Sequence, residues 1–422
     1  MKYYRSIFLA ALLIGILVSS ISIYNIESKT RVLDTEVIEL SKIKYGIFNV
    51  DEWKAALSSI IIKRINDFEL EPTKEEDLRI KIAAFLETAI DELEKSFFEY
   101  NSGSIKGFFK GSVANITGVY DVMRKDIPLL TESIIGFIKD PDNKNLAQDF
   151  ILEKLDEYSD ETFSEVDYTL LNIILKKHNA PTRIVAVSTI QEAIDDLTAQ
   201  KQPYIIAIFS MIMLLFIVVA FNNNFSQLDF LLLTLTCGIL LIVGVLLPMI
   251  NIDARISNME FSLLGESIQF KDQVLYFKSK SILEVVRLML VSSKADVLAV
   301  GVLVFMFSVV LPITKLVSSL IYIYSEKAQQ NSWLKFLVFK ISKWSMADVM
   351  VVAIFMAYIG FSGIISDQLA GLESITEHLD IMTTNASSLQ IGFFLFTSFA
   401  VLGLLTSHKI KYHFLKADAS DG

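Results

Sequence analysis

The feature that most limits the fold of this chain is a set of apolar runs, each about as long as a bilayer is thick. A transmembrane helix needs about 20 mostly apolar residues to cross the hydrocarbon core. Of the 422 residues, 53% are hydrophobic, which is too apolar for a water-soluble protein of this length. We therefore predict a polytopic, mainly α-helical membrane protein with six transmembrane helices. The six runs are Ser6–Tyr24, Tyr204–Phe221, Leu228–Ile250, Leu298–Tyr324, Val349–Ile365 and Leu389–Thr406.

The distribution of Lys and Arg predicts the orientation of these spans. Short loops rich in basic residues stay on the cytoplasmic side of a membrane. Basic residues cluster before the first run, between the fourth and fifth runs, and after the sixth, and six spans place all three segments on one side. We expect both termini in the cytoplasm and residues 27–202 in the periplasm. The basic residues concerned are Lys2, Arg5, Lys327, Lys335, Lys340, Lys343, Lys409, Lys411 and Lys416.

The first apolar run has two interpretations. Its basic start and short apolar core are typical of a secretory signal peptide. No pair of small residues marks a cleavage site after the core, however, and the apolar character continues to Ile26. Residues 1–26 are therefore predicted to be an N-terminal transmembrane anchor, with a cleaved signal peptide as the alternative. The five later spans do not depend on this choice.

Residues 27–202 are predicted to form a helical periplasmic domain. Apolar side chains recur at spacings of three and four within 51–70 and 75–98, which indicates amphipathic helices. The segment 27–202 contains 33 Asp and Glu and 22 Lys and Arg, a net charge of −11. Such an acidic domain disfavours binding to nucleic acid and docking on anionic lipid headgroups.

The rest of the chain divides into three parts. These are residues 203–227 (second transmembrane helix and short cytoplasmic loop), 228–408 (four-span domain) and 409–422 (cytoplasmic tail). Within the four-span domain, the outer loop 251–280 alternates apolar and polar residues, which predicts a small antiparallel β meander with turns at Gly265 and at Lys271–Asp272. Ser281 and Glu284 then form a capping-box signature at the start of a helix.

The sequence contains no recognisable catalytic motif. The single cysteine, Cys237, lies inside an apolar run, and the four histidines are scattered. The acidic run Asp156–Asp167 lacks the glycine and the closing glutamate of an EF-hand loop. We expect neither enzymatic activity nor a bound metal or cofactor.

Two charged residues lie at the membrane boundary. Lys315 is in the fourth apolar run and Asp348 begins the fifth. Ionisable residues at membrane depth are rare and are usually paired or functional. Ser345 and Asp348 also form a capping-box pattern. Three interpretations therefore stay open: Asp348 caps its helix, it caps the helix and pairs with Lys315, or it acts directly in transport.

From about residue 229 to residue 408, the chain resembles the paraquat-inducible protein A family of bacterial inner-membrane proteins. The resemblance rests on the stretches "VVLPITKL" and "KWSMADVMVV" and on the order of elements: a span ending in proline, a strand-rich outer loop and three further spans. The chain departs from the family in having one four-span unit and no cysteine-rich zinc ribbon. The candidate membrane-interface residues are Pro248, Pro312, Lys315, Trp344, Ser345, Met346 and Asp348.

The resemblance implies a function in lipid transport across the cell envelope and in membrane integrity. It implies membrane lipids as ligands and a lipid-carrying protein of the mammalian-cell-entry type as a partner, and the acidic domain argues against nucleic acid. One rival hypothesis is a membrane-anchored receptor or sensor whose periplasmic domain binds a ligand or partner. Another is a structural envelope protein without cargo.

Overall fold

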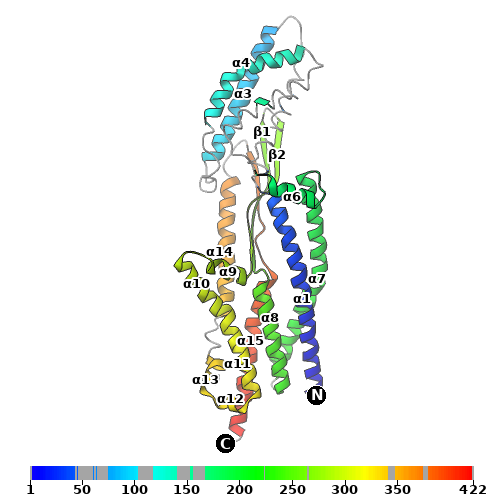
Figure 1. Ribbon diagram of the computed structural model, residues 1–422, viewed down its shortest axis with the longest axis vertical. Coiled ribbons are helices and arrows are strands. Elements are labelled where there is room, and N and C mark those ends of the chain that lie inside the picture. The colour runs from blue at the N-terminus through cyan, green and yellow to red at the C-terminus, as the bar shows by residue number, and fades with distance from the viewer. Residues whose placement is uncertain are drawn as a thin grey trace.

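The chain forms an elongated helical molecule, shown as a computed structural model in Figure 1. Both termini lie at one end of the long helices, and a small sheet and a helical hairpin lie toward the other. We call these the termini end and the sheet end. The structure describes residues 2–42, 45, 60, 63, 75–102, 117–139, 153–154, 167–222, 224–263, 266–340, 347–373 and 379–420.

Within these residues, six helices are long and apolar enough to cross a membrane, which confirms the six predicted spans. Five of them are single elements. The sixth consists of α10 (Ala295–Phe305), a π-helical turn η4 (Met306–Val310) and α11 (Leu311–Tyr324). The single helices are α1 (Lys2–Leu40), α7 (Arg183–Phe221), α8 (Gln227–Leu246), α14 (Ala347–Glu373) and α15 (Ile391–Ser420).

Helices α1 and α7 continue well past their apolar runs. A helix of 39 residues is about 58 Å long, roughly twice the thickness of the hydrocarbon core. The two helices run side by side to the sheet end (Figure 1). There they pack with the short helix α6 (Thr169–Lys177) around a separate apolar core that includes Leu40, Ile174 and Ile190. The first part of the 27–202 segment is thus a direct continuation of the first transmembrane helix.

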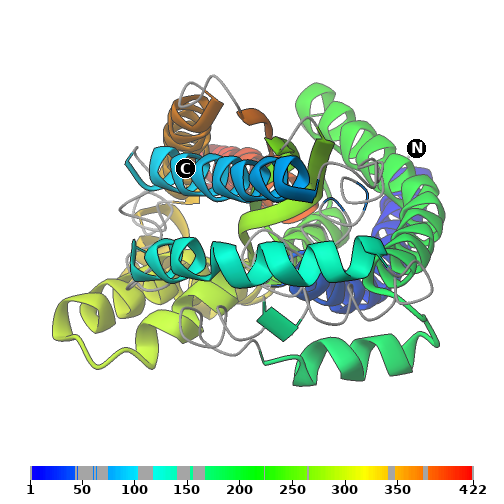
Figure 2. The same cartoon turned by 90° about the horizontal axis from the view of Figure 1, so that it is seen from above.

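A helical hairpin lies at the far tip of the sheet end. It consists of α3 (Glu75–Ser102) and α4 (Thr117–Lys139), which run side by side across the molecule (Figure 2). The helix predicted within 75–98 is confirmed, and its apolar stripe packs against α4 through Ile82 and Ile134. The helix predicted within 51–70 and the acidic run Asp156–Asp167 lie almost entirely outside the described residues.

The predicted antiparallel sheet is confirmed, with a different strand arrangement. A long hairpin joins β1 (Ile250–Leu263) to β2 (Glu266–Lys280), and β3 (Leu379–Asn385) pairs with the other edge of β1. The short strand β4 (Ser388–Leu389) pairs with the start of β1. The turn predicted at Gly265 lies outside the described residues. The turn predicted at Lys271–Asp272 is wrong, because β2 continues through both residues. Asp272 has φ of 52°, a left-handed conformation that aspartate tolerates better than most residues.

Short helices connect these elements. Helix α9 (Ile282–Leu290) begins with the predicted capping box: Glu284 N–H donates to Ser281 Oγ over 3.3 Å, and Ser281 N–H donates to Glu284 Oε2 over 3.0 Å. Between α11 and α14 lie α12 (Glu326–Gln330), α13 (Ser332–Lys335) and a π-helical turn η5 (Phe336–Lys340).

A buried ion pair fixes α1 against α8 at the termini end. The side chain of Asp229 is fully buried and accepts a hydrogen bond from Arg5 Nε over 3.0 Å. Ser6 Oγ donates to Oδ1 of Asp229 over 2.6 Å. The Ser226 N–H donates over 2.8 Å to Oδ2, the oxygen that also binds Arg5. The Arg5 guanidinium also lies 5.0 Å from the centre of the Phe225 ring. Because its apolar face is buried as well, α1 is an integral part of the helical bundle.

Candidate functional site

The predicted membrane-interface residues fall in three places. Lys315 and Pro312 lie in α11, where both are buried, and Pro248 lies between α8 and β1. Asp348 belongs to the first turn of α14, but its side chain lies outside the described part of the structure. Trp344, Ser345 and Met346 also lie outside it, so the Lys315–Asp348 pair and the Ser345–Asp348 cap stay predictions.

Lys315 links two transmembrane helices. Its Nζ donates a hydrogen bond over 3.4 Å to the backbone carbonyl of Gly403 in α15, and its side chain is only 7% exposed. One turn before it, Pro312 has no backbone N–H, and the preceding turn is π-helical, with Leu311 N–H bonded to the Met306 carbonyl. Such π-bulges are frequent at functional sites. Helix α11 therefore carries a buried cation close to an irregular turn.

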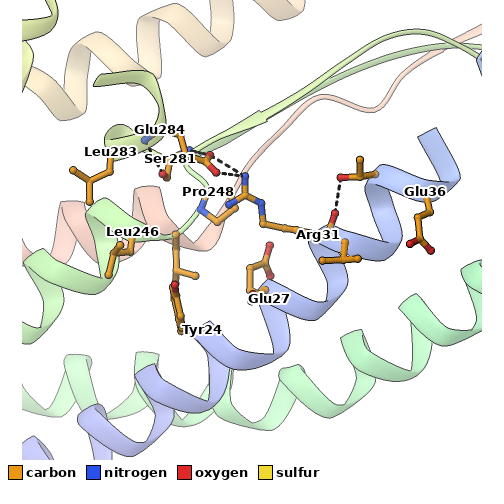
Figure 3. A pocket seen from close by; sticks show the side chains of 13 residues that line it. Tyr24, Glu27, Arg31, Glu36, Leu246, Pro248, Ser281, Leu283 and Glu284 are labelled. Carbon is orange, nitrogen blue, oxygen red and sulfur yellow. Dashed lines mark hydrogen bonds and ion pairs between the residues drawn. The ribbon is translucent and has the colours of Figure 1, made fainter. Parts of the chain in front are cut away.

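A pocket of about 550 Å³ lies at the sheet end of the helical bundle (Figure 3). Three elements form it: the outer half of α1, the end of α8 with the residues that follow it, and the start of α9. One wall is mostly apolar and the other carries charged and polar side chains. The lining residues are Tyr24, Glu27, Ser28, Arg31, Val32, Thr35, Glu36, Leu246, Leu247, Pro248, Ser281, Leu283 and Glu284.

An ion pair between Arg31 and Glu284 spans the pocket. Arg31 Nη2 donates to both carboxylate oxygens of Glu284, over 2.7 and 2.8 Å (Figure 3). Burial raises the pKa of the Glu284 carboxyl, but the hydrogen bonds from Arg31 and from the Ser281 backbone lower it, and the net pKa lies below its usual value. Glu284 is thus charged at neutral pH. It caps α9 and at the same time connects that helix to α1.

Two further carboxylates of the polar wall have cationic partners. Glu27 accepts a hydrogen bond from Lys201 of α7 over 2.7 Å, and both side chains are largely buried. Glu36 lies 2.7 Å from Nε2 of His178 and also contacts Lys177. These pairs join α1 to α7 and to the turn that follows α6. As a result, Glu27 and Glu36 on the polar wall each have a cationic side chain beside them.

A close backbone contact fixes the floor of the pocket. The N–H of Gly392, in the first turn of α15, donates to the Pro248 carbonyl over 2.9 Å. A Cβ atom on Gly392 would lie 2.5 Å from the carbonyl oxygens of both Leu247 and Pro248. Only glycine permits this approach, so α15, the end of α8 and the sheet meet directly beneath the pocket.

Comparison with known families identifies the central part of the chain. Residues 274–370 match the family model of paraquat-inducible protein A. This segment is similar to the paraquat-inducible protein A family. The finding confirms the resemblance predicted from the sequence and supports a membrane protein of this type. No significant match was found among curated proteins or among solved structures.

The paraquat-inducible protein A segment supplies one side of the pocket. It contains Ser281, Leu283 and Glu284, together with Pro312, Lys315 and Asp348. Arg31 and the rest of α1 lie outside the matched residues. The Arg31–Glu284 pair therefore joins the matched segment to a helix outside it.

Sequence reasoning identified Glu284 as a helix cap and did not identify the pocket. Arg31 and Glu284 are separated by 253 positions, so no local pattern connects them. One signal was present: Glu27 and Arg31 follow the first apolar run directly and lie one helical turn apart. Charges in that position mark the level at which a membrane helix enters water.

We predict that Lys315 forms an ion pair with Asp348. Asp348→Asn keeps most of the capping ability, so its expected effect is small if Asp348 only caps α14, since a lost cap costs about 0.5 to 2 kcal/mol. For a buried pair, Asp348→Asn and Lys315→Met should each cost about 3 to 5 kcal/mol, because each leaves one charge unpaired. The double variant should regain part of this loss. Detergent-unfolding curves measure the effects, and strictly additive losses would show that the residues do not interact.

Proposed function

We propose that this protein handles phospholipid in the bacterial inner membrane and takes part in lipid transport across the cell envelope. A lipid-carrying protein of the mammalian-cell-entry type is the proposed partner. The similarity of the 274–370 segment to the paraquat-inducible protein A family supports a membrane protein of this type. The six apolar helices support a location within a bilayer.

One observation carries the lipid assignment: the pocket has the two-part chemistry of a phospholipid. Its apolar wall includes Leu246, at the end of the apolar run of α8, and Leu283 of α9. Its polar wall includes Arg31, which lies just beyond the apolar run of α1. The pocket therefore spans the level at which acyl chains give way to headgroups. A guanidinium at that level is suited to phosphate, which arginine binds through paired hydrogen bonds.

We propose that the partner docks on the sheet or on the α3–α4 hairpin. Both lie at the sheet end (Figure 1). The long β1–β2 hairpin begins next to Pro248 and Ser281, which line the pocket, and extends toward α3 and α4. A carrier that binds the α3–α4 hairpin would lie on the same side of the membrane as the pocket.

The proposed orientation puts the sheet end in the periplasm and both termini in the cytoplasm. Reporter fusions after His413 and within 325–343 should report the cytoplasm, and fusions at Asn101 and Asp272 should report the periplasm. The basis is the concentration of Lys and Arg in the first group of segments. A periplasmic signal from the C-terminal fusion would overturn this orientation.

Purification in mild detergent, followed by mass spectrometry of lipids and proteins, tests the proposed function. The proposal predicts bound phospholipid and a co-purifying lipid carrier. A soluble small-molecule ligand without phospholipid would favour a receptor or sensor. Recovery of the protein with neither phospholipid nor carrier would favour a structural envelope protein. The matched control is an unrelated six-span protein from the same membranes, which reveals lipids retained non-specifically.

A further inference from the structure

The charges around the pocket indicate which phospholipid headgroup it selects. Within the described residues, the lining contains one cation, Arg31, and three carboxylates, Glu27, Glu36 and Glu284. Lys201 neutralises Glu27, Lys177 and His178 lie beside Glu36, and Arg31 pairs with Glu284. Each lining carboxylate thus has a cation beside it, and Asp34 of α1, which interacts electrostatically with Glu27 and Arg31, adds one more carboxyl next to the cluster. An added neutral group leaves these pairs unchanged, whereas an added anion leaves a negative charge without a partner close to three carboxylates.

Arg31 has donors available for a phosphate even while it binds Glu284. Both hydrogen bonds to Glu284 come from Nη2, which leaves Nε and Nη1 without a bond to another described residue. The side chain is about one quarter exposed, and it reaches into the pocket from α1 (Figure 3). A phosphate oxygen can therefore accept a hydrogen bond from Nη1 or from Nε without breaking the ion pair.

Glu284 provides a matching acceptor for an ammonium group. Its Oε2 accepts hydrogen bonds from Arg31 and from the Ser281 backbone, whereas Oε1 accepts only one, from Arg31, and has capacity for one more. A phosphate bound to Arg31 and an ammonium bound to Glu284 would lie close together, because the two side chains are themselves hydrogen-bonded. The short linker of a phosphoethanolamine headgroup joins two such charges at close range.

We propose that this pocket binds a zwitterionic phospholipid with a primary amine, with its phosphate on Arg31 and its ammonium on Glu284. This inference rests on the proposed lipid function and names the lipid class. An anionic glycerol headgroup offers Arg31 the same phosphate but has no cation for Glu284. A choline headgroup has a cation that cannot donate hydrogen bonds to the carboxylate. Both are expected to bind more weakly than the ethanolamine headgroup.

Native mass spectrometry of the purified full-length protein tests this selectivity. Phosphatidylethanolamine, phosphatidylglycerol and phosphatidylcholine with identical acyl chains are added separately at low lipid-to-protein ratio. Wild-type protein should retain the ethanolamine lipid best. Arg31→Gln should weaken its retention about 10-fold to 100-fold, the loss expected when a charge-assisted contact is removed. Arg287→Gln is the matched control, because Arg287 is an exposed arginine of α9 that does not line the pocket.

A second variant separates recognition from folding. Glu284→Gln keeps the capping box, since glutamine serves there as well as glutamate, but it removes the negative charge. It should reduce the preference for the ethanolamine lipid over the glycerol lipid, a ratio that a purely structural role would leave unchanged. Equal retention of the three lipids by wild type, or an unchanged preference in both variants, would overturn the headgroup assignment. If the protein still co-purifies with phospholipid and a carrier, the proposed function survives that result; if no lipid is retained, both fail.

Discussion

Asp229→Asn is expected to destabilise the helical bundle by about 3 to 5 kcal/mol. Asparagine is nearly the same size as aspartate and can still accept a hydrogen bond from the Ser226 N–H, so the main change is the loss of the negative charge. Arg5 would then be left largely buried without its counter-ion, and removing one member of a buried pair costs about this much. Detergent-unfolding curves of the purified protein measure the difference.

Two controls make this result specific. Asp296→Asn makes the same chemical change in the first turn of another helix, at an exposed side chain, and should shift stability by less than about 1 kcal/mol. Adding Arg5→Met to Asp229→Asn should recover part of the loss, because neither charge is then unpaired. A loss below about 1 kcal/mol for Asp229→Asn alone would contradict the view that this pair fixes α1 on α8.

Gly392→Ala is the other substitution with a large expected effect. The added Cβ would lie 2.5 Å from two backbone oxygens, those of Leu247 and Pro248, and backbone cannot move aside as a flexible side chain does. Overpacking in a close-packed interior typically lowers the free energy of unfolding by about 1 to 3 kcal/mol. Because this clash is with backbone atoms, we expect a loss of about 3 kcal/mol or more. The shift should also widen the pocket floor, so lipid retention should fall with stability.

Gly360→Ala provides the matched comparison. Gly360 lies inside α14, and a Cβ there would meet no atom within 4 Å. Alanine should stabilise that helix by up to about 1 kcal/mol, since glycine is the poorer helix former. Both variants are compared in the same unfolding and lipid-retention assays. Equal stability of the two would mean that α15 does not approach the pocket floor as closely as the structure shows.

Local sequence patterns predicted the features that depend on nearby residues. The six spans were identifiable because bilayer thickness sets a minimum apolar length, and the Ser281–Glu284 cap because its two partners are three residues apart. The β1–β2 pairing followed from period-2 alternation between adjacent segments. Strand β3 was not predicted. Its strand conformation depends on pairing with β1, which lies more than a hundred residues earlier in the chain, so no local pattern marks it.

The buried charges show the limit of the same reasoning. From the sequence, Arg5 was interpreted only as one of the basic residues that set the orientation of the spans. Asp229 was seen only as a residue at the start of an apolar run. Their pairing depends on how α1 crosses α8, which a single sequence does not specify. The same holds for the pocket, whose polar wall combines α1 with α9. The proposed Lys315–Asp348 pair has its own test in the double-mutant cycle.

Photo-crosslinking from the pocket wall in living cells tests the central claim, that this pocket holds phospholipid. A photoreactive amino acid replaces Thr35, which lines the polar wall and donates a hydrogen bond to the carbonyl four residues earlier. Thr189 is the control: it is also exposed, makes the same type of hydrogen bond on α7, and does not line the pocket. We predict a phospholipid adduct at position 35 that is strongly reduced by Arg31→Gln, and little adduct at position 189. Absence of an adduct at position 35, or equal yields at both positions, would contradict the assignment of this pocket to phospholipid.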